Sequence, residues 1–304
     1  MTPPAAGPAA GPDSGPAFVA VDWGTTNRRC FHVAADGSVI ARTSDDRGIL
    51  SVDDFPAEVA ALRRDAGDAP LLLCGMVGSN RGWIDVPYAE APADIAAIVA
   101  GIVRPQPGIA IVPGVVQRDE LRPDIMRGEE VQILGALALK LVGDGLVCHP
   151  GTHTKWIELE GGCMMRLRTV MTGDLLAALK AKSILSDLLA HEPAADAVFL
   201  DGVDQTLEGG DLTAELFGAR ARVVTGQMSA ADAASRISGL LIGSDLRAGL
   251  GRGRSDVVPL IGARPLCERF ALALERAGRE SVVIDGETAF VAGARAIMAA
   301  MGTA

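Results

Sequence analysis

The sequence lacks the features of several protein classes. No uninterrupted apolar run approaches about 18 residues, so no membrane span is expected. No basic residue precedes Arg28 and no continuous apolar segment stands near the N-terminus, which excludes the pattern of a secretory signal. Aromatic residues make up only 4% of the chain, and no basic stripe carries interleaved aromatics, which argues against nucleic-acid binding. We therefore expect a cytoplasmic protein without a membrane or nucleic-acid partner.

Groupings of cysteine or histidine typical of metal sites are also absent. The cysteines lie mostly in apolar runs, which favours reduced thiols in a cytosolic core: Cys30, Cys74, Cys148, Cys163 and Cys267. The net charge of −10 argues against simple electrostatic capture of anions. Any bound phosphate would therefore need local hydrogen-bond donors and a metal.

The composition that is present is that of a globular protein. Hydrophobic residues make up 49% of the 304 residues and charged residues 22%. This length predicts two domains or one large domain with an ample core. Residues 1–16, rich in Pro, Gly and Ala, cannot bury enough apolar surface to order themselves, so we predict a disordered tail there and exclude it from the fold.

Two similar segments open the two halves of the chain. Extended runs over 18–23, 28–35 and 38–45 are separated by a Gly-Thr-Thr-Asn turn and a hairpin-like Asp36-Gly37 turn. The segment GLVCHPGTHTKWIELEGGCMMRLRTV (145–170) repeats this order of strand, Gly-Thr turn, strand, Gly-Gly turn and strand. Further patterns predict strands at 71–74, 108–114, 256–262 and 281–286, and helices near 54–65, 93–103, 128–141, 173–190, 193–208, 229–248, 265–278 and 287–301. Repeated mixed sheets covered by helices predict two α/β domains with a cleft between them.

The Gly-Thr turns suit a phosphate site. Backbone N–H groups and hydroxyls converge there, and glycine lets the backbone approach a ligand closely. Asp22, at the end of the first strand, could hold Mg²⁺ directly or through water. The alternative is a tight turn with local side-chain-to-backbone hydrogen bonds. Two such turns favour the phosphate site, because they can hold a triphosphate from both sides of a cleft.

The duplicated units resemble the two phosphate loops of the sugar kinase, hexokinase, Hsp70 and actin superfamily. More narrowly, nearly all of 17–301 resembles the 2-dehydro-3-deoxygalactonokinase family, in the strings VDWGTTNRR, GMVGSNRGW, MRGEEVQ, PGTHTKW, RTVMTGDL, SGLLIG and GETAFVAG. The resemblance implies two duplicated ribonuclease H-like (actin-like ATPase) domains with mixed sheets flanked by helices. Residues 17–141 would form the sugar side and 142–304 the ATP side, with the helix at 287–301 as connector.

The resemblance also implies an ATP-dependent kinase of galactonate catabolism that uses Mg²⁺ and phosphorylates the terminal 6-hydroxyl of 2-dehydro-3-deoxy-D-galactonate. The implied nucleotide-binding residues are Asp22, Gly24, Thr25 and Thr26 in the first loop, Gly151, Thr152 and His153 in the second, and Gly262 in the adenosine-binding segment. The implied sugar-binding residues are Ser79, Asn80 and Trp83.

Three acids are candidates for the general base. The resemblance places it at Glu129, within Gly128-Glu129-Glu130. Glu130 competes, because one residue along a helix turns a side chain by about 100°. Both acids could instead only complement a helix N-terminus, a contribution of about 0.3–1 kcal/mol. Asp174 replaces a Glu usual in the family, and would either bind substrate or a metal-bound water, or cap the following helix.

The substrate carboxylate calls for an arginine that can bind it in a bidentate manner. Arg29, Arg127 and Arg168 stand beside these motifs, and Arg127 is the first choice; surface ion pairing is the alternative for all three. Two other functions stay open: an exopolyphosphatase-like phosphohydrolase, for which the chain shows no basic run to line a channel, and a non-catalytic ATP-binding switch, which is generally a longer chain. The gluco epimer or another sugar acid is a further alternative substrate. The oligomeric state is not predicted.

Overall fold

The computed structural model describes residues 15–67, 69–251 and 256–302. The tail predicted over 1–16 therefore lies outside the described residues, apart from its last two positions. All five cysteines are free thiols, and four of them are buried, as their apolar surroundings predicted. Within the described ranges, no helix combines the length and the apolar character needed to cross a membrane.

The first half of the chain builds a six-stranded sheet in the order β3-β2-β1-β4-β7-β6. The central strand β1 (Phe18–Trp23) runs antiparallel to β2 (Arg28–Val33) and parallel to β4 (Leu71–Gly75). The outer strands are β3 (Val39–Asp45), β7 (Ile109–Ile111) and β6 (Val103–Gln106). Strands β1 and β4 are almost wholly buried because helices cover both faces of the sheet.

The second half builds a five-stranded sheet in the order β12-β11-β10-β13-β14. These strands are β10 (Gly145–His149), β11 (Thr154–Glu160), β12 (Cys163–Val170), β13 (Val257–Gly262) and β14 (Glu280–Asp285). In both sheets the first three strands are antiparallel neighbours, and the next strand adds in parallel beside the first. The duplication predicted from the two Gly-Thr turns is therefore confirmed.

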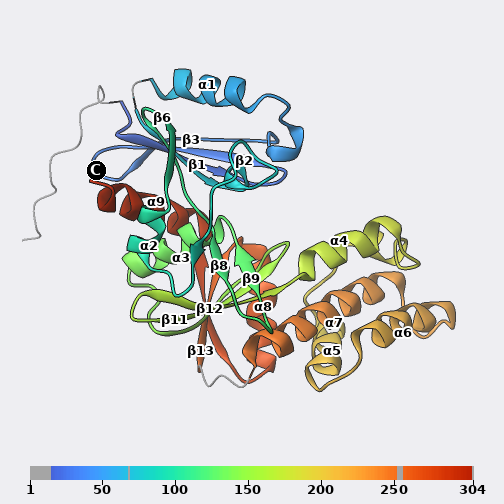
Figure 1. Cartoon of the computed structure of the whole chain (residues 1–304). Coiled ribbons are helices and arrows are strands. Elements are labelled where there is room, and N and C mark those ends of the chain that lie inside the picture. Colours follow the sequence, from blue (N-terminus) through green and yellow to red (C-terminus); the bar gives the residue numbers. More distant parts are fainter. Residues whose placement is uncertain (1–14, 68, 252–255, 303–304) are drawn as a thin grey trace, which may run out of the picture.

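Two helices lie between the sheets (Figure 1). These are α3 (Glu129–Ala138) and α9 (Gly286–Ala300), and they cross at glycines. A β-carbon on Gly135 would lie 1.8 Å from the carbonyl oxygen of Ala289, and one on Gly293 equally close to that of Val131. One apolar cluster joins both helices to the inner faces of both sheets. On the outer faces, α1 (Phe55–Ala66) covers the first sheet and α8 (Arg264–Arg276) the second.

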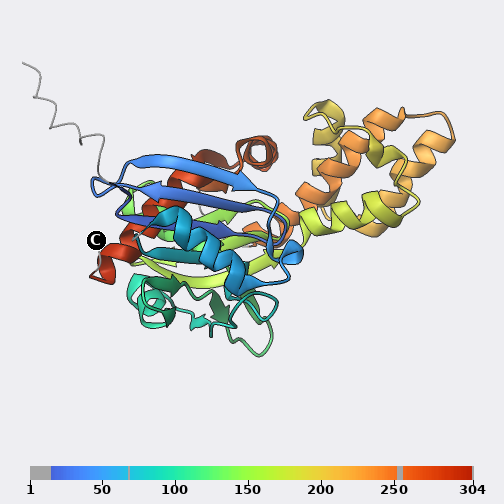
Figure 2. The ribbon, with the colours of Figure 1, turned by 90° about the horizontal axis from the view of Figure 1, so that it is seen from above.

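A helical region projects from the second half of the chain (Figures 1 and 2). It consists of α4 (Thr172–Lys182), α5 (Ala197–Leu207), α6 (Leu212–Val224) and α7 (Ala230–Leu250), and it has an apolar cluster of its own. The helix predicted over 173–190 is too long, since α4 ends at Lys182 and only a short 3₁₀ turn follows at Leu188–Ala190. Helix α6 was not predicted.

A small third sheet was also not predicted. It is formed by β5 (Ala89–Glu90), β8 (Val115–Gln117) and β9 (Asp124–Met126), and it lies against β12 of the second sheet. Next to it, α2 (Ile95–Ala100) is shorter than the helix predicted over 93–103, because the Asp94 side chain caps its N-terminus by accepting a hydrogen bond from the Ala97 N–H.

Candidate active site

The ends of β1, β10, α3 and α9 meet at one place. Asp22, at the end of β1, accepts a hydrogen bond of 2.6 Å from Arg29 of β2, and Arg29 also lies 3.5 Å from Glu287 in the first turn of α9. Burial raises the pKa of Asp22, the Arg29 guanidinium lowers it, and the nearby Glu129 and His149 have smaller effects on it. These electrostatic effects place groups from both halves of the chain within reach of Asp22.

His149, at the end of β10, joins the two halves. Its Nε2 lies 3.1 Å from the Gln132 side-chain oxygen on α3, and its buried Nδ1 has no partner within the described part of the chain. Burial lowers the pKa of the His149 imidazole, so the ring is neutral at pH 7. It is thus a polar contact rather than a charge beside the acids.

Backbone hydrogen bonds fix the first Gly-Thr turn, both within the turn and from the segment at residues 48–49. The Gly24 N–H donates to Asn27, and the N–H groups of Gly48 and Ile49 donate to the carbonyls of Thr26 and Gly24. Thr25 and Thr26 are exposed. Gly48 was missed in the sequence, although it is needed here, because a β-carbon on it would lie 2.4 Å from the Thr25 carbonyl oxygen.

The second turn packs directly on the start of α4. The Asp174 N–H donates to the Thr152 carbonyl at 2.9 Å, and the Asp174 carboxylate lies 3.9 Å from His153 Nε2. The Asp174 side chain is half-exposed and makes no capping hydrogen bond to α4. Gly262, at the end of β13, lies under the same turn, and a β-carbon on it would lie 3.3 Å from the Pro150 carbonyl oxygen.

The two adjacent glutamates at the start of α3 have different environments. Glu130 is fully buried, and both of its carboxylate oxygens accept from the Gly128 N–H, at 2.9 and 2.7 Å. Burial first, and then the charge of Glu129, raise the pKa of Glu130 to about 8. Glu129 is partly exposed, accepts from the Arg127 N–H at 3.1 Å, and acts electrostatically on Asp22 and His149. Glu129 therefore lies on the side of the two Gly-Thr turns, and Glu130 lies in the core.

Arg127 is a buried cation whose donors are only partly used. It is 9% exposed, its Nη2 donates to the Val86 carbonyl at 2.8 Å, and its guanidinium stacks 4.1 Å from the centre of the Tyr88 ring. Its Nε and Nη1 have no partner within the described ranges. Gly78 lies beside Nη1, because a β-carbon on it would be 3.0 Å away. Tyr88 was missed, since nothing in its sequence context marks it.

The other predicted sugar contacts differ in exposure. Ser79 is 5% exposed, and its hydroxyl donates to the Met76 carbonyl at 2.7 Å, so it shapes its own loop. Asn80 is exposed, and Trp83 is partly buried against the cluster beneath α1. Arg168 is exposed on β12, and its side chain makes no ion pair or hydrogen bond with the described residues.

Lys155 was also missed. This lysine of the PGTHTKW string is 6% exposed, and its Nζ donates to the Ile125 carbonyl at 2.8 Å and to the Thr169 hydroxyl at 3.0 Å. The first contact ties β11, which follows the second turn, to β9, which leads into Arg127 and Glu129. The PGTHTKW string, already noted for its resemblance to the family, was the signal that could have identified Lys155.

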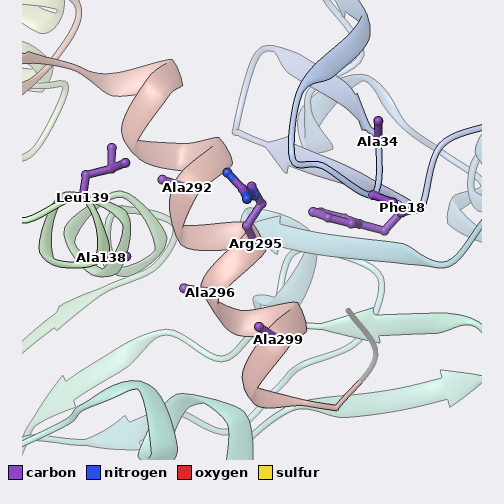
Figure 3. Close-up of a pocket in the computed structure, with 10 residues that line it drawn as sticks. Phe18, Ala34, Ala138, Leu139, Ala292, Arg295, Ala296 and Ala299 are labelled. Atoms are coloured by element: carbon purple, nitrogen blue, oxygen red, sulfur yellow. The ribbon is translucent and has the colours of Figure 1, made fainter. Parts of the chain in front are cut away.

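A hollow of about 400 Å³ lies elsewhere, beside the start of β1 (Figure 3). Phe18 of β1 and Ala34, directly after β2, line it on one side, and Ala292, Arg295 and Ala296 line it from α9. Asp22 stands four residues further along β1, roughly 13 Å away at the rise of a strand. The hollow is therefore separate from the turns that meet at Asp22.

Comparison with known proteins identifies the family. A family model described as 2-keto-3-deoxy-galactonokinase matches residues 22–297. The chain belongs to this family. "Probable 2-dehydro-3-deoxygalactonokinase DgoK1" of Rhizobium meliloti is 37% identical over 291 residues, covering 91% of this chain and 94% of that protein. The 2-dehydro-3-deoxygalactonokinase of Escherichia coli is 32% identical over 286 residues, covering 92% and 97%.

A solved structure agrees with the sequence comparisons. A Sinorhizobium meliloti protein that carries the same kinase name superposes with a TM-score of 0.88 at 36% identity, over 93% of this chain and 99% of that one. The predicted family, and with it a kinase of galactonate catabolism, is confirmed.

Proposed function

We propose that this 2-keto-3-deoxy-galactonokinase family member transfers the γ-phosphoryl group of ATP to the terminal 6-hydroxyl of 2-dehydro-3-deoxy-D-galactonate, with Glu129 as general base. The observation that carries the proposal is the position of Glu129, which is partly exposed at the start of α3 and electrostatically coupled to Asp22 and His149 at the ends of β1 and β10. Each of these strands runs directly into one Gly-Thr turn, so the base stands between the two turns.

The phosphates of ATP lie between the two turns. The exposed Thr25 and Thr26 supply hydroxyls from the first half, and Thr152 from the second. The backbone of both turns is held rigidly by the contacts to Gly48 and Asp174, so their donors keep fixed positions. Gly262, which has a positive φ of 151° and lies beneath the second turn, is the proposed contact to the nucleoside. This arrangement catalyses mainly by positioning, which suits phosphoryl transfer, since that reaction needs little covalent help from the protein.

Asp22 is the proposed Mg²⁺ ligand. One of its oxygens is engaged by Arg29 and the other accepts no hydrogen bond within the described ranges. Among the described residues, no group of three or more acidic, cysteine or histidine side chains is arranged to hold a metal ion. One carboxylate fits Mg²⁺, because this ion is commonly held by one or two carboxylates, waters and substrate phosphates. The ion would neutralise charge on the phosphates.

The sugar acid binds on the wall formed by Asn80, Trp83 and Arg127. The Nε and Nη1 groups of Arg127 have no partner among the described residues, so this guanidinium keeps donors for the substrate carboxylate, and Tyr88 fixes the plane of the group. With the substrate carboxylate held there, Glu129 accepts the proton of the 6-hydroxyl while the hydroxyl oxygen attacks the γ-phosphorus. The new oxygen–phosphorus bond forms as the bond to the ADP oxygen breaks.

The proposal includes the two domains predicted from the sequence. Residues 17–141 hold the sugar acid, residues 142–304 hold most of ATP, and the cleft between them closes around both ligands to exclude water. Scattering curves of the protein with and without ADP and sugar acid measure this closure. Identical curves in all states would count against it.

The decisive experiment is coupled ADP release with ATP and Mg²⁺ on three samples: 2-dehydro-3-deoxy-D-galactonate, its gluco epimer and no sugar. We expect ADP release to depend on the galacto acid, and the phosphorus–carbon coupling in the product to appear at C6. Release without sugar would support the ATP-binding switch. Phosphate release from polyphosphate, added as a fourth sample, would support the phosphohydrolase.

A further inference from the structure

A buried carboxylate outside the site connects the projecting helices to the second Gly-Thr turn. Asp245 of α7 is fully buried. One of its oxygens accepts a hydrogen bond of 2.7 Å from the Trp156 indole N–H of β11, and the other accepts one from the Thr172 hydroxyl at the start of α4. The Trp156 ring also packs on α7, where a β-carbon on Gly249 would lie 2.0 Å from it.

We infer that Asp245 is a positioning residue that fixes the second phosphate turn, Gly151–His153, through Thr172. This inference rests on the proposed role of that turn in binding ATP. Thr172 is the first residue of α4, and its hydroxyl donates to Asp245 instead of capping its own helix. The next two residues contact the turn directly: Gly173 packs on Gly151 and Thr152, and the Asp174 N–H donates to Thr152.

The same carboxylate fixes the turn from its other side. Trp156 lies three residues after His153, on the strand that leaves the turn. One side chain therefore holds both the strand that follows the turn and the helix start that packs on it. Burying a carboxylate costs free energy that a purely packing role does not require. Burial raises the pKa of Asp245 to about 6, although the side chains of Thr172, Trp156 and Thr154 lower it. The two donors account for its position.

The test compares Asp245→Asn, Thr172→Val and Thr172→Ser with wild type. Asp232→Asn, at the other end of α7, is the matched control. Displacement of the turn should raise KM for ATP about tenfold in Asp245→Asn and Thr172→Val, and leave KM for the sugar acid within about twofold. Thr172→Ser, which keeps the hydroxyl, should retain wild-type KM values, and so should Asp232→Asn. In the double variant Asp245→Asn/Thr172→Val the two effects on KM should not add, because both substitutions remove the same contact, the one between Thr172 and Asp245.

Equal increases of KM for both substrates, or a lowered melting temperature with normal KM values, would overturn the inference in favour of a purely structural role. If Asp245→Asn does not fold, the two Thr172 variants decide by themselves. Calorimetric titration with ADP gives a readout independent of the sugar. Weaker ADP binding in the variants, with no sugar-dependent turnover in wild type, would support the inference while the proposed function fails. Unchanged ADP binding contradicts the inference.

Discussion

Gly173 lies in van der Waals contact with Gly151, and a β-carbon built on Gly173 would stand 2.7 Å from the Gly151 carbonyl oxygen and from the Thr152 α-carbon. Atoms cannot approach so closely, so any larger residue at 173 must displace either the start of α4 or the second turn. The Thr-Gly-Asp string thus has a geometric reason for its glycine. Glycine is needed there because the start of α4 and the second turn approach each other closely. An unusual backbone conformation is not the reason, since the backbone angles of Gly173 are those of an ordinary helix.

Gly173→Ala should therefore weaken nucleotide binding. Alanine favours a helix by up to about 1 kcal/mol over glycine, so a loss of function would arise from the contact with the turn. We expect KM for ATP to rise about tenfold or more, measured by coupled ADP release. Gly218→Ala, in α6, is the control, because the nearest atom to its β-carbon would be the Glu215 carboxylate at 3.9 Å. A Gly173→Ala enzyme with normal KM for ATP would show that the second turn does not bind the nucleotide.

Glu129→Gln should lower kcat by about 10² or more, because it removes the proposed proton acceptor and keeps the side-chain shape. Glu130→Gln should lower kcat far less, since Glu130 is fully buried and bonds to the Gly128 N–H. Both are measured at saturating ATP and sugar acid. Asp174→Asn is assayed beside them. A large loss of kcat in Glu130→Gln or Asp174→Asn, with normal turnover in Glu129→Gln, would assign the role of general base to that other residue.

Glu130 should make the stability of the protein depend on pH. Its pKa is raised from 4.5 to about 8 in the folded state, so the group is neutral at pH 7. Its contribution to the free energy of unfolding is complete below about pH 4.5 and is lost as the pH rises through 8. The total loss is about 5 kcal/mol at most. Urea unfolding of wild type and Glu130→Gln from pH 5 to 9 measures this. We expect the variant to gain relative stability with rising pH. A constant difference across this range contradicts the raised pKa.

Arg127→Lys should raise KM for the sugar acid by about 10- to 100-fold, because an ammonium group cannot bind a carboxylate in a bidentate manner or stack flat on Tyr88. KM for ATP should stay within twofold. Arg168→Lys serves as the comparison, since Arg168 is an exposed arginine of the opposite half. If only the Arg168 variant raises KM for the sugar acid, the carboxylate binds on β12.

Gly135→Ala and Gly293→Ala should destabilise the protein, because each adds a methyl group where α3 and α9 touch. Overpacking of this kind typically costs about 1–3 kcal/mol, and here the contact is backbone to backbone, so the upper end is expected. Gly143→Ala is the control, since nothing lies within 4 Å of its β-carbon. Urea unfolding at one pH provides the comparison. Equal stability of all three variants would show that the two helices can separate without cost.

The sequence predicted the parts of this molecule whose signals are local. Asp22 and the two Gly-Thr turns follow apolar strands, and the recurrence of that order revealed the duplicated sheets. Strands β5, β8 and β9 have two or three residues each, too few for a periodic pattern. Asp245 was not identifiable, because its partners Thr172 and Trp156 lie 73 and 89 residues away. Tyr88 acquires its role only by stacking on Arg127.

The contact between Lys155 and the Ile125 carbonyl has a consequence for how the enzyme can change over evolution. Lys155 stands two residues after the second turn, and Ile125 stands four residues before Glu129, so a short stretch of backbone on each side connects the proposed base to the second Gly-Thr turn. The loop at 76–84 is outside this connection. In the proposed arrangement, mutations in this loop alter which sugar acid is accepted while the alignment of the proposed base and the phosphates is inherited unchanged.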